Sequence, residues 1–163
     1  MSALIYVETT IPSFYTEKRK GVEIEARRKW TREWWMKPKP GQRLVTSAVV
    51  LEELERIPDP SRRDESVALL RELEELDYVA EIEEIAAVYL QHKLMPAEAL
   101  GDADHLALAS FYNCDILVTW NCKHLANANK TGHIRRVNAL LGLRTPLLVT
   151  PLELLEKDYE SET

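Results

Sequence analysis

The segment GDADHLALASFYNCDILVT, residues 101–119, contains a helix pattern followed by a strand pattern. From about Asp102 a run of good helix formers continues through LALASFY, and Asn113 is suited to end that helix in a left-handed conformation. Residues 116–119 then form a short, β-branched apolar run. A helix that leads into a buried strand is the unit from which parallel α/β sheets are built. The segment therefore predicts the fold class.

The same alternation recurs along the rest of the chain. Strand patterns cover residues 3–8, 43–47 and 147–150. Helix patterns, several of them bounded by proline, cover residues 21–36, 48–57, 61–79, 83–95, 128–142 and 151–157. The helix over 61–79 has an acidic outer face and Ser61 as its expected cap. We therefore predict a parallel sheet with helices on both faces.

The length and composition fit a single domain. The chain has 163 residues, of which 45% are hydrophobic and 29% are charged. We assign residues 1–157 to one domain and residues 158–163 to a polar C-terminal tail. We find no N-terminal leader pattern and no apolar run of about 18 residues, which predicts a cytoplasmic protein without a membrane span. Cys114 and Cys122 lack the paired spacing of a zinc site and are expected to be reduced.

Charge is segregated along the chain, although the net charge is −6. Residues 17–43 carry ten Lys and Arg against four Asp and Glu, and residues 121–144 carry five against none. Residues 52–84 carry four against thirteen. If the two basic segments fold onto the same side, they form a positive surface for phosphate groups. Solvated helix faces are the alternative interpretation.

Four acid or amide side chains lie where a parallel sheet binds its ligands. Glu8 ends the first predicted strand, and Glu53 lies in the helix that follows the second. Asp102 begins the helix that leads to residues 116–119, and Asn121 follows that strand. Ligands of such sheets bind beyond the carboxyl ends of the strands, at the point where strand order reverses. We therefore expect these residues to meet at one edge of the sheet.

Clustered carboxylates raise one another's pKa and resist ionisation unless a cation neutralises them. The candidates include no Cys or His cluster, and oxygen ligands favour Mg²⁺ or Mn²⁺. Such an ion positions and activates water for attack on a phosphodiester. The pattern therefore predicts hydrolysis of nucleic acid.

Five stretches of the sequence match one family in the same order along almost the whole chain. They are YVETTIPSFY near the start, TREWW at 31–35, LVTSAVVLEELERIP at 44–58, GDADHLALASFYNCDILVTWNCKHLANA at 101–128 and LLVTPLELL at 147–155. In these stretches the chain resembles PIN-domain nucleases of the VapC-type toxin group, from type II toxin-antitoxin systems. The resemblance implies a PIN-like α/β fold with a central parallel sheet of about five strands. It also implies a Mg²⁺- or Mn²⁺-dependent endoribonuclease that cleaves single-stranded RNA, forms a homodimer and is blocked by a cognate antitoxin.

The resemblance also implies roles for individual residues. Glu8, Glu53 and Asp102 take the metal-ligand positions, and Asn121 completes the catalytic set. Glu8 stands where the family commonly has Asp, and Asn121 stands where many members have a fourth Asp. Because the missing charge weakens a second metal site, we expect one ion or weak metal affinity. The residues that we assign to substrate binding are Thr9, Arg32, Thr119, Lys123 and His124.

Several alternatives remain open. Asp102 is also a suitable N-cap for its helix, and Asp104 and Glu52 are the rivals of Asp102 and Glu53 for the ligand roles. His105 is expected to have a structural or substrate-orienting role. A PIN-like module that has lost turnover and acts by binding RNA or protein is the main alternative function. A phosphatase acting on small phosphate esters is the least favoured, because the first strand carries no DxD nucleophile.

Overall fold

The computed structural model describes residues 2–155, which form a five-stranded sheet in the order β3-β2-β1-β4-β5. All neighbouring strands are parallel. The strands are β1 (Ala3–Val7), β2 (Gln42–Ser47), β3 (Glu74–Leu76), β4 (Ile116–Val118) and β5 (Leu147–Val149). The predicted α/β fold with about five parallel strands is confirmed.

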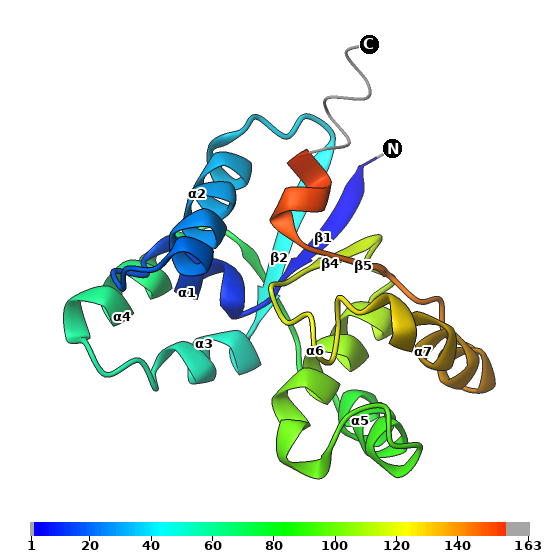
Figure 1. Ribbon diagram of the computed structural model, residues 1–163. Coiled ribbons are helices and arrows are strands. Elements are labelled where there is room, and N and C mark those ends of the chain that lie inside the picture. Colours follow the sequence, from blue (N-terminus) through cyan, green and yellow to red (C-terminus); the bar gives the residue numbers. More distant parts are fainter. Residues whose placement is uncertain (1, 156–163) are drawn as a thin grey trace.

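Helices cover both faces of the sheet, as the sequence predicted (Figure 1). Those on one side are α1 (Thr10–Tyr15), α2 (Val22–Met36), α3 (Ala48–Leu54) and α4 (Pro60–Leu69). On the other side are α5 (Ala80–Gln91), α6 (Leu100–Phe111) and α7 (Ala128–Leu140), with the short 3₁₀ helix η1 (Ala97–Ala99) before α6. Among the described residues, no helix combines the length and the apolar composition that a membrane crossing requires.

The core is built around the central strand β1. Ile5, Tyr6 and Val7 are essentially inaccessible to solvent, as are the apolar residues of α6 that face the sheet. Trp34 of α2 is buried and its neighbour Trp35 is only partly buried, because adjacent helical residues diverge by about 100°. Asn113 has φ 55° after α6, as the predicted left-handed terminator requires.

The predicted helix over residues 61–79 is wrong in its second half. Helix α4 ends at Leu69, and residues 74–76 form the edge strand β3, which pairs with Val45–Ser47. The acidic sequence there suits a helix locally, but the open edge of β2 supplies backbone partners that outweigh local preference. The expected cap is also corrected, because Asp59 accepts the backbone N–H of Ser61 at 3.0 Å.

Helix α1 was not among the predicted helices, and the other differences lie at element ends. The helix predicted over 83–95 is α5, which begins at Ala80 and ends at Gln91. Two residues after this end, Lys93 has a positive φ of 57°. Residues 151–155 are helical, as predicted. The rest of that predicted helix and the tail assigned to 158–163 lie outside the described residues.

Candidate active site

Strands β1 and β4 lie side by side in the sheet. From β1 the chain adds β2 and β3 on one side and then crosses to β4 and β5 on the other, so that the order reverses beside β1. Val7 pairs with Val118, which brings Glu8 and Thr119 together just beyond the two strands. This is the switch point at which parallel α/β sheets bind ligands.

Glu8 joins the ends of these two central strands. Its side chain is buried, and its Oε2 accepts hydrogen bonds from the backbone N–H of Thr10 (2.9 Å) and the hydroxyl of Thr10 (2.5 Å). The hydroxyl of Thr119 donates to the same oxygen at 2.8 Å. Three protein donors therefore hold one oxygen of Glu8.

Glu53 of α3 is also held through one oxygen. The hydroxyl of Thr9 donates to Oε1 at 2.9 Å, and Nε2 of His105 contacts the same atom. The other oxygen, Oε2, lies 3.1 Å from the position that a Cβ would take at Gly101. Glycine at the start of α6 therefore leaves room for the carboxylate.

Asp102 lies in the first turn of α6, which begins at Leu100 with Ala99 as its N-cap. The alternative that Asp102 is the N-cap is therefore wrong. Asn121 lies close enough to Asp102 to lower the pKa of that carboxyl, and its Oδ1 accepts the backbone N–H of His124 at 2.9 Å. Because Oδ1 is used in that turn, Nδ2 is the atom of Asn121 that is left to donate a hydrogen bond.

Glu53 and Asp102 line one pocket of about 500 Å³. Their rivals Glu52 and Asp104 line it too. Asp104 is held by the hydroxyl of Tyr78, which donates to its Oδ1 at 2.8 Å. Both rival acids thus border the pocket together with Glu53 and Asp102.

Burial and His105 determine the charges in this site. Burial raises the pKa of Glu8 and of Asp102, and nearby hydrogen bonds and the charge of His105 offset only part of the effect. Burial alone would raise the pKa of Glu53, but His105 and Thr9 lower it below its ordinary value. Burial alone would lower the pKa of His105, but the contact with Glu53 and the surrounding carboxylates raise it. The contact between Glu53 and His105 therefore favours the charged form of both side chains.

The site matches a hard divalent cation in its donor types. Oε2 of Glu53 and the carboxylate of Asp102 face the same pocket, and Mg²⁺ and Mn²⁺ prefer such oxygen ligands. Across residues 2–155, however, no three His, Cys, Asp or Glu side chains are already grouped to hold a metal ion. Glu53 and Asp102 therefore fit the ion, and Glu8 as a third ligand stays a prediction.

The residues assigned to substrate binding fall into three settings. Thr9 and Thr119 donate to Glu53 and Glu8, so they orient the acids. Lys123 is exposed, and Nδ1 of His124 lies 3.3 Å from Nζ of Lys130. Arg32 borders a different hollow and donates to the backbone oxygen of Tyr15 at 2.9 Å.

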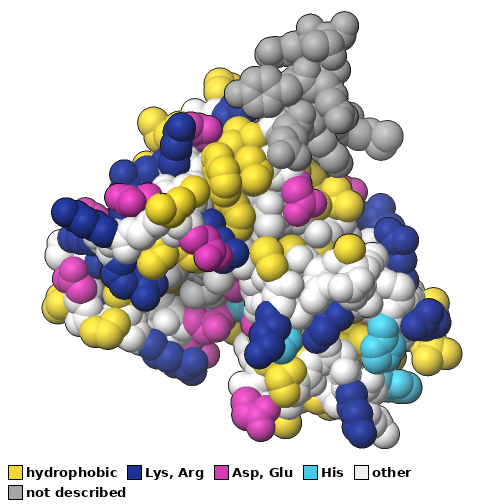
Figure 2. All heavy atoms as spheres, in the orientation of Figure 1, with side chains coloured by type: hydrophobic (Ala, Val, Ile, Leu, Met, Phe, Trp, Pro, Cys, Tyr) yellow, Lys and Arg dark blue, Asp and Glu magenta, His cyan; other side chains and the backbone are white. Residues whose placement is uncertain are grey.

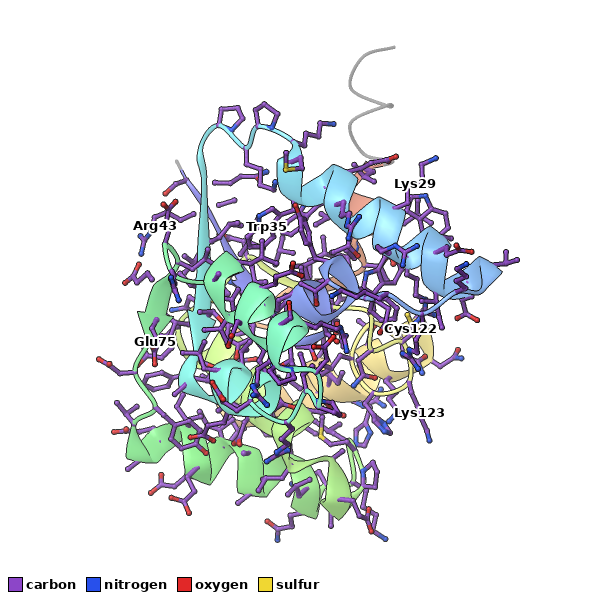
Figure 3. The ribbon with its side chains drawn as sticks, turned by 90° about the vertical axis from the view of Figure 1, so that its left-hand side faces the viewer. Lys29, Trp35, Arg43, Glu75, Cys122 and Lys123 are labelled. Carbon is purple, nitrogen blue, oxygen red and sulfur yellow. The ribbon has the colours of Figure 1, made fainter. Side chains whose placement is uncertain are left out.

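Basic side chains flank the centre of one face of the molecule. Figure 2 shows Lys and Arg in one group over α2 and α4 and in another near α7, so both basic segments reach this face. Figure 3 shows Lys29 of α2 and Lys123 of the loop after β4 on the same side of the molecule. The arrangement fits the predicted positive surface for phosphates.

Tyr6 and Trp120 make contacts that were not predicted from the sequence. The hydroxyl of Tyr6 lies 2.8 Å from Nδ1 of His105, which links the central strand to α6. Trp120, beside Asn121, was given no role in the site. Its backbone N–H donates to Thr10 and its indole N–H donates to Thr31. A polar residue within an apolar strand, such as Tyr6 here, was the available signal for the first contact.

A model of the PIN domain family matches residues 19–128. The chain belongs to the PIN domain family. The matched range includes Glu53, Asp102 and Asn121 and begins after Glu8. No curated protein matches the sequence.

Three solved structures are similar to this PIN domain protein. VapBC-1 from nontypeable Haemophilus influenzae is 19% identical, with 74% of this chain and 89% of that chain covered, at a TM-score of 0.51. VapBC2 from Rickettsia felis, in a structure bound to a DNA fragment from its promoter, has the same identity and coverage at a TM-score of 0.48. FitAcB from Neisseria gonorrhoeae is 13% identical, with 91% and 98% covered, at 0.48. The Haemophilus structure supports the PIN-like fold.

Proposed function

We propose that this PIN domain protein is a divalent-metal-dependent endoribonuclease that cleaves single-stranded RNA and acts as a VapC-type toxin. The observation that carries the proposal is that Glu53 of α3 and Asp102 of α6 line one pocket. PIN domains are generally nucleases and typically use divalent metals. No protein nucleophile is needed, since water is the attacking group in such hydrolysis.

The residues of the chain have separate tasks in this proposal. A divalent ion bound by Glu53 and Asp102, with Mg²⁺ or Mn²⁺ expected, supplies Lewis-acid activation of water and stabilises charge on the leaving oxygen. Asn121 orients Asp102 through its Nδ2 group. Lys123 and Lys130 place positive charge beside the acids, where it attracts the phosphates of RNA. Burial and then the charge of Lys130 lower the pKa of His124, so His124 is a neutral hydrogen-bonding group at pH 7.

A cognate antitoxin and a homodimer complete the proposal. The fold is shared with VapBC-1, and a VapC-type toxin would be held inactive by its VapB-type partner. Co-purification of the chain with the product of an adjacent small gene would support this part. Recovery of the chain as a lone monomer beside such a product would contradict it.

The decisive experiment is cleavage of an end-labelled single-stranded RNA by the full chain. We expect cleavage with Mn²⁺, none with EDTA, and a rate at least about 100-fold lower for Asp102→Asn. Asp64→Asn is the matched control, because Asp64 is an exposed acid on α4. Cleavage that persists in EDTA, or that Asp102→Asn leaves unchanged, would reject the proposal.

Two observations favour a second function, an RNA- or protein-binding module without turnover. Glu8 already accepts three protein hydrogen bonds, and Asn121 presents an amide where many relatives of this family carry an acid. The same assay distinguishes this function. RNA retained by the chain in a filter-binding experiment, with no cleavage by any divalent metal, would establish it.

A further inference from the structure

A buried line of hydrogen bonds ends on Glu53. The hydroxyl of Tyr6 lies 2.7 Å from Oγ of Ser47 and 2.8 Å from Nδ1 of His105. The opposite ring nitrogen of His105, Nε2, contacts Oε1 of Glu53. The side chains of Ser47, Tyr6 and His105 are fully buried, so water does not compete for these contacts.

The direction of donation at Glu53 is fixed by chemistry. An ionised carboxylate only accepts hydrogen bonds, so Nε2 of His105 carries the proton and donates to Oε1. In the neutral ring the Tyr6 hydroxyl donates to Nδ1, and in the charged ring Nδ1 donates to the Tyr6 oxygen. Either state keeps the ring in the same orientation, with Nε2 aimed at Glu53.

We infer that Tyr6 and His105 are positioning residues that hold Oε1 of Glu53 and thereby aim Oε2 into the pocket beside Asp102. Oε1 takes the contacts from both Thr9 and His105, and Oε2 faces Gly101. The inference rests on the proposed function, because the ligand that Oε2 would meet there is the divalent ion.

The need for positioning follows from the place of Glu53 in the fold. Its side chain is 26% exposed and has three rotatable bonds, so a free carboxylate on α3 would turn toward solvent. The anchors are rigid, because Tyr6 belongs to the central strand and His105 to the buried face of α6. Groups that orient a metal ligand in this way typically affect metal affinity by 10- to 100-fold.

The test measures the Mn²⁺ affinity of the full chain by electron paramagnetic resonance. Tyr6→Phe is compared with Tyr89→Phe, a matched variant in which another fully buried tyrosine loses a hydroxyl that is bonded to Asn138, away from Glu53. We expect Tyr6→Phe to weaken Mn²⁺ binding by about threefold to tenfold and Tyr89→Phe to leave it unchanged. Equal affinities of the two variants would overturn the inference.

A second pair of variants separates positioning from packing at His105. His105→Gln keeps an N–H donor near the place of Nε2, whereas His105→Leu fills the buried site with an apolar side chain. Positioning predicts that the Gln variant retains Mn²⁺ affinity within about threefold and that the Leu variant loses at least tenfold. If the Leu variant binds Mn²⁺ as well as the Gln variant does, His105 only packs and the inference fails.

A measurement on the metal-free protein tests the line itself. The ring ¹⁵N resonances of His105 should shift in Tyr6→Phe and stay in place in Tyr89→Phe, and unchanged resonances in both would overturn the inference.

Failure of the proposed function would give a different result from failure of the positioning. A wild-type chain that binds Mn²⁺ more tightly than Tyr6→Phe yet cuts no RNA would refute the nuclease and leave the positioning intact. A wild-type chain that binds no Mn²⁺ would refute both.

Discussion

The two ends of α6 each carry a buried polar network, and the two networks differ in charge. At the C-terminal end, the hydroxyl of Tyr89 donates to Oδ1 of Asn138 at 2.5 Å. Nδ2 of Asn138 then donates to Ser110 at 3.1 Å and to Thr145 at 2.9 Å. Burial raises the pKa of Tyr89 to about 12, so every member of this network is neutral.

The network at the N-terminal end joins His105 to Glu53, and Asp102 lines the same pocket as Glu53. Burial raises the pKa of Asp102, and only part of that effect is offset by Asn121. A neutral network whose donors and acceptors are all matched stabilises the fold, whereas perturbed carboxylates beside a pocket mark a site prepared for a ligand. The comparison therefore assigns stability to one end of α6 and ligand binding to the other.

Breaking the neutral network should have the largest effect on stability. Asn138→Leu leaves the hydroxyls of Tyr89, Ser110 and Thr145 without their shared partner, and we expect a loss of about 2–4 kcal/mol in the free energy of unfolding. Urea denaturation measures the loss. Asn129→Leu, at an exposed position of the same helix, is the control. A loss below about 1 kcal/mol would show that the network does not stabilise the fold.

Glu17 is a buried carboxylate with cationic partners, and its lowered pKa contrasts with the raised pKa of Asp102. Hydrogen bonds from Arg19, together with the charge of Arg62, lower the pKa of Glu17 to about 2. Because the folded pKa is lowered, this stabilisation is complete above the unfolded pKa of about 4.3 and is lost as pH falls toward 2. Glu17→Gln should therefore cost about 1–2 kcal/mol at pH 7 after allowance for solvent screening.

The pH dependence checks the cause of that loss. Thermal unfolding of Glu17→Gln and wild type should converge between pH 5 and pH 2, where both side chains become neutral. Glu33→Gln, at an exposed position of α2, should change little at any pH. A gap between Glu17→Gln and wild type that stays constant with pH would contradict the ion-pair explanation.

Asp102→Asn should have a smaller effect of opposite sign. The folded pKa of Asp102 is raised, so its ionisation destabilises the metal-free fold as pH rises through that value. We expect the variant to be more stable than wild type at pH 8, and the gain should vanish below the unfolded pKa. Differential scanning calorimetry in EDTA at pH 8 and pH 3 measures both. If the variant were less stable than wild type at pH 8, burial of the ionised Asp102 carboxylate would not destabilise the fold.

Gly101→Ala should have the smallest effect on stability but should weaken the binding of Mn²⁺. Alanine favours a helix over glycine by about 1 kcal/mol, but its Cβ would lie 3.1 Å from Oε2 of Glu53 and push the carboxylate aside. The two effects oppose each other, so we expect an unfolding free energy within about 0.5 kcal/mol of wild type. Mn²⁺ affinity should fall severalfold. Gly132→Ala on α7, where a Cβ meets only Arg136 at 3.8 Å, is the control, and equal affinities of the two variants would contradict the crowding.

The sequence predicted the sheet well because its buried strands carry strong local signals. The runs that became β1, β2, β4 and β5 are apolar and bounded by turn residues, which suits strands covered on both faces. The edge strand β3 carries no such signal. Its residues Glu74 and Glu75 are exposed, and only the backbone of β2 makes them a strand.

The candidate site was predictable in part for the same reason. Glu8 and Asn121 could be placed because they follow β1 and β4, whose ends meet at one edge of the sheet, and Asp102 because it begins the helix that leads to β4. The contacts of His105 could not, because they depend on how α6 packs against Tyr6 and α3. The direction of the Asn121 amide likewise depends on the turn that it forms with His124.

The three-residue strands β3 and β5 at the borders of the sheet limit how copies of this chain can associate. Each offers only a short row of backbone groups, and acidic side chains on β3 would repel a like strand laid against it. These borders therefore disfavour the joining of two sheets into one continuous sheet. We expect a dimer of this chain to form through its helical faces, and the short edges also to protect the fold from strand-by-strand aggregation.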